Sequence, residues 1–252
     1  FAQVTNPPLD GIREEIVTDI SLNLGKDRNI FSITERQCRK LRIQNPVLSN
    51  EDLEKVRNIS VESFQAETIS MLYPKDKGLN GLEDALEDII VQVTKAVERG
   101  TNIIILSDRG VNKDLAPIPS LLAVGAIHSS LIKKGLRTRT SLVVEAGDAI
   151  EVHHFATLIG FGANAVNAYL AGDTIRAMFD EELESGETTI KKLLGNYSKA
   201  INYGLLKVFS KMGISTVQSY QGAQIFEILG IGKDVVDTYF TGSISRIGGI
   251  SL

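Results

Sequence analysis

The sequence has one cysteine, no excess of basic residues and no long apolar run. Cys38 alone cannot form a disulfide framework or a four-cysteine iron–sulfur or zinc site. The 27 lysines and arginines are outnumbered by 31 acids, and the net charge of -4 does not indicate a nucleic-acid-binding surface. Apolar runs such as residues 103–106 are far shorter than a membrane span. We therefore expect a cytoplasmic protein (stromal if it comes from a plastid), with neither nucleic acid nor membrane as a partner.

The single cysteine has cationic neighbours. Arg36, Arg39 and Lys40 surround Cys38, and positive charge of this kind can make a thiol reactive. The alternative is an inert thiol on the edge of a strand. The sequence alone does not decide between these two interpretations.

The sequence has enough hydrophobic residues for a full globular core. Hydrophobic residues make up 43% of the 252 positions, enough for one large α/β domain or two small ones. The first residue is Phe1 rather than methionine, from which we expect the chain to be part of a longer one.

Helical and strand-like patterns alternate from residue 81 onward. Apolar residues recur at helical spacing over 82–97, with Gly100 as the expected C-cap, and a continuous apolar run at 102–106 is typical of a buried strand. The pattern continues with helix 120–134, strand 141–144, helix 149–159, strand 163–167, helix 188–211, strand 214–218 and helix 222–229. It predicts an α/β fold with a mostly parallel sheet of βα units. Periodicity does not decide whether the sheet closes into a barrel.

The first 80 residues are less regular. Capping residues predict helices at about 10–19 and 51–57, and a mixture of β-branched and apolar residues predicts a strand within 60–71.

One candidate site follows the strand at 102–106. Asp108 and Arg109 come directly after this strand, and ligands bind at the carboxyl ends of parallel strands. The two side chains could hold a substrate carboxylate or an anion, or they could pin the loop. Both interpretations stay open from the sequence.

A second candidate site brackets the strand predicted at 214–218. Ser215 and Thr216 offer hydroxyl groups, and Gly222 is expected to open a helix whose backbone N–H groups could hold a phosphate. A flavin phosphate would lie after the late strands of a barrel. No glycine-rich dinucleotide or P-loop motif is present to support it.

A metal site and a catalytic set are not predicted. His153 and His154 are adjacent, so on a helix they point in different directions and do not readily share one metal ion. No arrangement of nucleophile, base and acid stands out elsewhere.

Several long motifs, in order along the chain, resemble the central domain of glutamate synthase large subunits. They are residues 1–10 (FAQVTNPPLD), 107–110 (SDRG), 116–125 (APIPSLLAVG), 135–139 (GLRTR), 141–145 (SLVVE), 151–156 (EVHHFA), 160–163 (GFGA), 211–220 (KMGISTVQSY) and 222–226 (GAQIF). The resemblance covers essentially the whole chain, and it implies a single domain over residues 1–252.

The resemblance implies a fold and a role. The central domain of that family is a degenerate (β/α) barrel, similar to an FMN-binding barrel without the cofactor. It lies between a glutaminase domain and an FMN synthase domain of the same chain, and those domains hold the cysteine nucleophile, FMN and a 3Fe–4S cluster. The parent enzyme is an oxidoreductase acting on CH–NH2 donors. It makes glutamate from glutamine and 2-oxoglutarate, with electrons from ferredoxin or an NADPH-oxidising small subunit.

For this chain the resemblance implies no cofactor of its own and no activity in isolation. It places Thr5 and Asn6 near the entrance of an ammonia tunnel, where polar groups could pass neutral ammonia. The alternative for Asn6 is a cap of the turn before Pro7 and Pro8. Two rival functions remain: a flavin- or phosphate-binding barrel with its own ligand site, and a free-standing small-molecule-binding domain.

Overall fold

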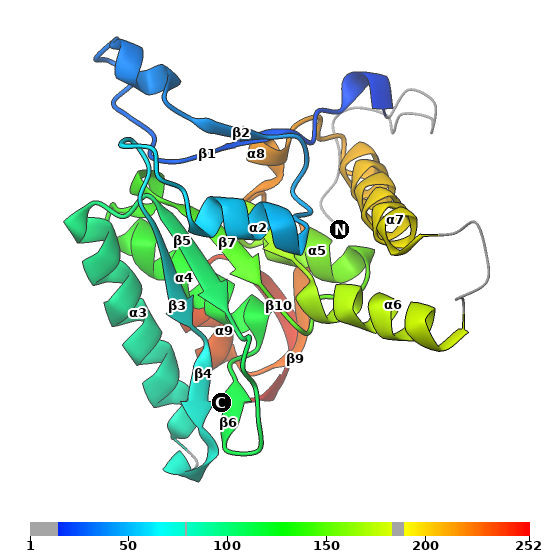
Figure 1. Cartoon of the computed structure of the whole chain (residues 1–252). Coiled ribbons are helices and arrows are strands. Elements are labelled where there is room, and N and C mark those ends of the chain that lie inside the picture. Colours follow the sequence, from blue (N-terminus) through cyan, green and yellow to red (C-terminus); the bar gives the residue numbers. More distant parts are fainter. Residues whose placement is uncertain (1–14, 79, 183–188) are drawn as a thin grey trace.

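The computed structural model describes residues 15–78, 80–182 and 189–252, and the side chains of residues 180–182 are not described (Figure 1). At its centre is a sheet of four strands that are all parallel to one another. In spatial order they are β3 (Ala66–Ser70), β5 (Ile103–Ser107), β7 (Ser141–Glu145) and β8 (Ala165–Asn167). The prediction of an α/β fold with a mostly parallel sheet is confirmed.

The sheet winds in one direction, as a barrel does. Each strand lies beside the next one along the chain, and helices form the crossovers: α3 (Gly81–Arg99), α4 (Ser120–Lys133) and α5 (Val152–Gly160). Beyond β8, Val47 forms a parallel bridge with Val166, although it precedes β3 in sequence. The arrangement is therefore barrel-like, but among the described residues the four-stranded sheet does not close on itself.

The central strands and helices form where the sequence pattern predicts them. Every residue of β5 and β7 is buried, as expected for strands covered on both faces. Helix α3 turns one apolar face to the core through residues such as Leu86, Ile89 and Val93, and it ends at Gly100 as predicted.

Helix α2 (Asn50–Arg57) and two later helices complete the surroundings of the sheet. Ser49 caps α2 by accepting a hydrogen bond from the Asp52 N–H, and the buried side chains of Leu53 and Val56 hold it against the core. In Figure 1, α2 lies in front of the sheet and α4 behind it. The later helices are α6 (Tyr169–Glu182) and α7 (Ile190–Lys211).

Three small sheets surround this core. Antiparallel pairs join β1 (Leu22–Leu24) to β2 (Leu41–Ile43) and β4 (Leu72–Pro74) to β6 (Leu115–Pro117). A parallel pair joins β9 (Glu227–Ile231) to β10 (Ile244–Ile250), with α9 (Lys233–Tyr239) between them in sequence. Short 3₁₀ helices lie at Glu35–Cys38, Lys75–Lys77 and Arg137–Arg139.

The predictions for residues 214–229 are wrong. The predicted strand is replaced by the short helix α8 (Val217–Tyr220), because the Thr216 hydroxyl accepts a hydrogen bond from the Ser219 N–H and starts a helical turn. The predicted helix does not form: Gln224 has a φ of 54°, and Glu227–Ile231 pairs with β10 as strand β9. Gly222 therefore does not open a helix.

The remaining differences from the predicted elements are smaller. Residues 15–17 are helical, while the rest of the helix predicted at about 10–19 lies mainly outside the described residues. Helix α6 was missed by the sequence pattern. Within the described part of the chain, no helix is both long enough and apolar enough to cross a bilayer.

Candidate functional site

A row of polar residues marks the carboxyl ends of the four central strands. Ser70, Ser107, Glu145 and Asn167 are the last residues of their strands, and the pairing register places them side by side. Ser107, Glu145 and Asn167 are buried. This is the edge at which α/β enzymes commonly bind their substrates.

The Glu145 carboxylate is held by three side chains. Its Oε1 accepts a hydrogen bond from Arg109 Nε at 2.7 Å, and its Oε2 accepts from Arg57 Nη2 at 2.8 Å and from Ser107 Oγ at 2.6 Å. Burial alone would raise the pKa of Glu145, but these hydrogen bonds outweigh it and the net shift is downward. The carboxylate is thus charged and saturated by partners from within the chain.

Asp108 and Arg109 lie at this edge as predicted, but they turn to different partners. Both carboxylate oxygens of Asp108 accept from the Gly147 N–H, at 3.1 and 2.9 Å, which ties the loop after β5 to the loop after β7. The Arg109 guanidinium lies 4.1 Å from the centre of the Tyr169 ring while its Nε bonds to Glu145. These are the contacts of loop pinning, and the anion contacts of both residues stay a prediction.

Burial also perturbs two acids of this edge. It raises the pKa of Asp108, partly offset by hydrogen bonds from Gly147 and Tyr169. Burial, followed by the nearby Asp108 charge, raises the pKa of Tyr169 to about 12. The hydroxyl of Tyr169 therefore keeps its proton and acts as a donor to Asp108.

The residues of the second predicted site form hydrogen bonds with other parts of the chain. The Ser215 carbonyl accepts from the Asp19 N–H at 2.8 Å, and Thr216 caps α8. The Gly222 N–H donates to the Gly160 carbonyl at 2.9 Å. The one backbone donor of Gly222 is therefore used within the chain, and α8 is only four residues long. The anion contacts of Ser215, Thr216 and Gly222 themselves stay a prediction.

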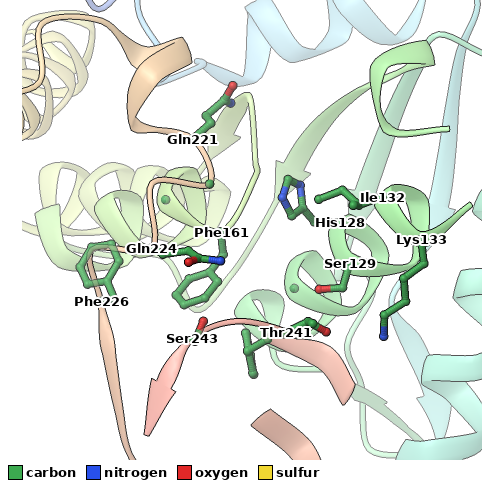
Figure 2. A pocket seen from close by; sticks show the side chains of 14 residues that line it. His128, Ser129, Ile132, Lys133, Phe161, Gln221, Gln224, Phe226, Thr241 and Ser243 are labelled. Atoms are coloured by element: carbon green, nitrogen blue, oxygen red, sulfur yellow. The ribbon is translucent and has the colours of Figure 1, made fainter. Parts of the chain in front are cut away.

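A pocket of about 430 Å³ lies away from the polar edge, and Figure 2 shows it. Its lining comes from α4, from the end of α5 and from the segments 221–226 and 240–243. Aromatic and polar side chains share the lining. They include His128, Lys133, Phe161, Gln224, Phe226 and Phe240.

His128 enters this pocket from α4 and is fixed by the half-buried Arg137. Arg137 Nε donates to His128 Nδ1 at 2.9 Å, and its other nitrogens donate to the carbonyls of Thr140 and Gly162 at 2.7 and 2.8 Å. Burial first, and then the Arg137 charge, lowers the pKa of His128 to about 4. The imidazole is therefore neutral at pH 7.

The close packing around His128 depends on Gly162. A Cβ atom at this position would lie 2.2 Å from His128 Nδ1, so no larger residue fits without moving the ring. Sequence reasoning missed His128, since a single histidine on an apolar helix carries no pattern of its own. Gly162 could be read from the sequence, but its contact with His128 could not be predicted from it.

The remaining candidates are two histidines of α5, the cysteine and two residues near the N-terminus. His154 Nδ1 accepts from the N–H groups of Ile150 and Glu151 at the start of α5, and the His153 ring meets the edge of Phe226. No group of possible metal ligands occurs among the described residues. Cys38 is exposed and ends a 3₁₀ helix, so its expected place on a strand edge is wrong. Thr5 and Asn6 lie outside the described residues.

Comparison with known proteins identifies the family. The model of the glutamate synthase central domain matches residues 1–232. The chain belongs to this family. The glutamate synthase [NADPH] large chain of Bacillus subtilis (strain 168) is 47% identical to the whole of it, and the ferredoxin-dependent glutamate synthase of Cyanidium caldarium is 43% identical. The chain spans 16% and 17% of the lengths of these relatives.

Similarity to solved structures is weaker. The flavin-binding domain of baker's yeast flavocytochrome b2 is 16% identical with a TM-score of 0.41, over 76% of this chain and 43% of that one. A mandelate oxidase mutant with benzaldehyde is 15% identical with a TM-score of 0.41, over 67% of this chain and 41% of that one.

Proposed function

We propose that this glutamate synthase central domain is a non-catalytic connecting module. It joins the glutaminase domain to the FMN synthase domain and forms part of the path that ammonia takes between them. The observation that carries the proposal is the saturation of Glu145 by Arg57, Arg109 and Ser107. Where a catalytic α/β domain would bind its substrate, the carboxylate of this one is bonded on both oxygens by side chains of the same chain.

The chemistry of the complete enzyme comes from other parts of it. The chain spans only 12–17% of the length of its relatives, which include NADPH, NADH and ferredoxin-dependent glutamate synthases. In our proposal those parts supply the cysteine nucleophile, the FMN and the 3Fe–4S cluster, and ferredoxin or an NADPH-oxidising subunit supplies electrons. The isolated domain neither hydrolyses glutamine nor forms glutamate, and the complete enzyme works in the cytoplasm or the plastid stroma.

A protected path for ammonia has a chemical reason. Ammonia that is protonated in bulk water loses the lone pair with which it attacks the 2-oxoglutarate carbonyl. A connecting domain that excludes water keeps the molecule neutral during transfer. We propose that Thr5 and Asn6 line this path.

The test uses Asn6→Ala in the complete enzyme. We expect glutaminase turnover to continue while glutamate formation from glutamine falls, because ammonia escapes before it reaches the synthase site. Glutamate formation from added ammonium salts should be unchanged. The measurement is the ratio of glutamine hydrolysed to glutamate formed, with Asn23→Ala on the exposed side of β1 as the matched control.

A second variant separates the path from the alternative role of Asn6 as a turn cap. Asp caps a turn as well as Asn does but introduces a charge. If Asn6 only caps, Asn6→Asp should restore full coupling. If it lines the path, Asn6→Asp should be uncoupled like Asn6→Ala. An unchanged ratio in both variants would refute the assignment of Asn6.

A further inference from the structure

The pocket beside His128 is independent of the proposed connecting role. We propose that it binds a planar aromatic anion of about the size of a nucleoside monophosphate. The proposal rests on the donors that face the pocket, on the charge of its lining, on its aromatic walls and on its size.

The first argument is the tautomer of His128. A guanidinium group can only donate, so the bond from Arg137 Nε makes His128 Nδ1 an acceptor. The single proton of the neutral ring must then lie on Nε2. This nitrogen is on the side of Gly222, where an added Cβ would lie 3.9 Å from it. Figure 2 shows the ring directed into the pocket, which therefore receives one fixed N–H donor.

The second argument is charge. Lys133 contributes an ammonium group, and none of the residues that line the pocket is acidic. Among the described residues the Lys133 Nζ makes a long contact of 3.5 Å with the Thr238 carbonyl, and the Thr241 hydroxyl donates to the Asp237 carbonyl at 3.0 Å. An anionic group placed between Lys133 and Thr241 could approach the ammonium more closely than the Thr238 carbonyl does.

The third argument is the aromatic wall. The rings of Phe161 and Phe226 are stacked with centroids 6.1 Å apart, and Phe161 meets Phe240 edge-on at 5.1 Å. These rings come from three separate segments and converge on one pocket. A flat aromatic ligand can stack on such a wall, and stacking of this kind does not depend on the identity of the ring.

Backbone strain points to the same place. Gln224 is the one described residue other than glycine with a positive φ, at 54°. Strained backbone of this kind concentrates at binding sites. The strain holds the Gln224 amide beside Phe161 in Figure 2, where it can bond to the edge of a heterocycle.

The size of the pocket limits the range of possible ligands. Its volume of about 430 Å³ lies within the range of about 300–1,000 Å³ found for small-molecule sites. A small dicarboxylate such as 2-oxoglutarate would leave the aromatic wall uncovered. An aromatic ring that carries one anionic group can stack on the phenylalanine rings and also bind His128 and Lys133.

The test is calorimetric titration of the complete glutamate synthase with two aromatic anions, AMP and indole-3-carboxylate. Saturable binding of either supports the proposal, and the stronger binder distinguishes a nucleotide from another aromatic acid. Ribose 5-phosphate, which lacks the ring, and adenosine, which lacks the anion, should each bind at least roughly tenfold more weakly than AMP. Absence of saturable binding by both aromatic anions would overturn it, and so would equal affinity for AMP and ribose 5-phosphate.

Two variants place the binding in this pocket. His128→Asn keeps an acceptor for Arg137 near the position of Nδ1 but removes the donor at Nε2, so we expect roughly tenfold weaker binding with the fold intact. Lys133→Gln should weaken binding about fivefold, and less so at high salt. Lys134→Gln is the matched control, because Lys134 is adjacent but bonds to Thr94 outside the pocket. Unchanged affinity in both His128→Asn and Lys133→Gln would show that the ligand binds elsewhere.

Discussion

Two polar regions lie at opposite ends of the same sheet, and they are built in opposite ways. At the carboxyl ends of the strands, Glu145 is charged and its oxygens are bonded by three side chains. At the amino ends of β7 and β8, Arg137 orders His128 but leaves its second nitrogen facing a pocket. In the first region both carboxylate oxygens of Glu145 are bonded within the chain, although Arg57 Nε and Asn167 Oδ1 have no hydrogen-bond partner among the described residues. In the second region the free nitrogen of His128 faces a pocket.

The comparison concerns where a barrel-like domain keeps its charged groups and where it leaves space for a ligand. In such folds, chemistry is expected where strands end, and here that edge ties together α2, the loop after β5 and the end of β7. The space for a ligand lies at the other end of the sheet. The position at the carboxyl ends of the strands therefore does not by itself predict a ligand site, because the charged groups there must also be free to bind a ligand.

The largest expected effect is the loss of stability when the Glu145 carboxylate is removed. Glu145→Gln leaves Arg57 and Arg109 without their shared carboxylate, and breaking a buried ion pair costs about 3–5 kcal/mol. Both arginines keep some exposure, at 28% and 43%, so we expect a loss near the lower end, about 3 kcal/mol. Urea unfolding of the 252-residue chain measures it.

The matched control is an ion pair on the surface. Glu67 pairs with Arg99 at 3.1 Å, and both side chains are substantially exposed, at 33% and 59%. Glu67→Gln should cost less than about 1 kcal/mol. Equal losses for the two variants would mean that the carboxyl-end cluster is no more closed than the surface.

A smaller effect should appear when the pH is lowered. The pKa of His128 is lowered from 6.5 to about 4, so the unfolded chain binds this proton at a higher pH than the folded chain. Stability is therefore full above pH 6.5 and decreases as the pH falls toward about 4. Since one pKa unit corresponds to about 1.4 kcal/mol, we expect a loss of about 2 kcal/mol between pH 7 and pH 5.

His128→Asn is the control for this pH dependence, because asparagine does not titrate. Urea unfolding at several pH values should give a flatter curve for the variant than for the unchanged chain. The two curves should differ mainly below pH 6.5, the unperturbed pKa of the imidazole. Parallel curves across that range would contradict the assignment of a half-buried, neutral His128.

The sequence predicted the central architecture because burial leaves a direct pattern. The strands β5 and β7 are continuous apolar runs, and α3 repeats apolar residues at helical spacing. Helix α6 was missed, and residues 214–229 were assigned wrongly. There, a hydroxyl cap at Thr216 and the positive φ of Gln224 decide the local structure rather than periodicity.

The candidate sites were predictable only in part. Asp108 and Arg109 could be placed at a strand end, because topology alone brings them there. The partners at this edge could not be predicted: Arg57 lies 88 residues before Glu145 and reaches it from the end of helix α2. His128 belongs to an otherwise apolar face, and its role depends on a tertiary contact with Arg137.

The most direct test of the central claim is the activity of the complete glutamate synthase with Glu145→Gln, assayed well below its unfolding temperature. If the carboxyl-end cluster is structural, kcat and KM for glutamine-dependent glutamate formation should stay within about twofold of the unchanged enzyme while Tm falls. A decrease in kcat of roughly tenfold or more with Tm unchanged would contradict the account, because it would place Glu145 in the reaction itself.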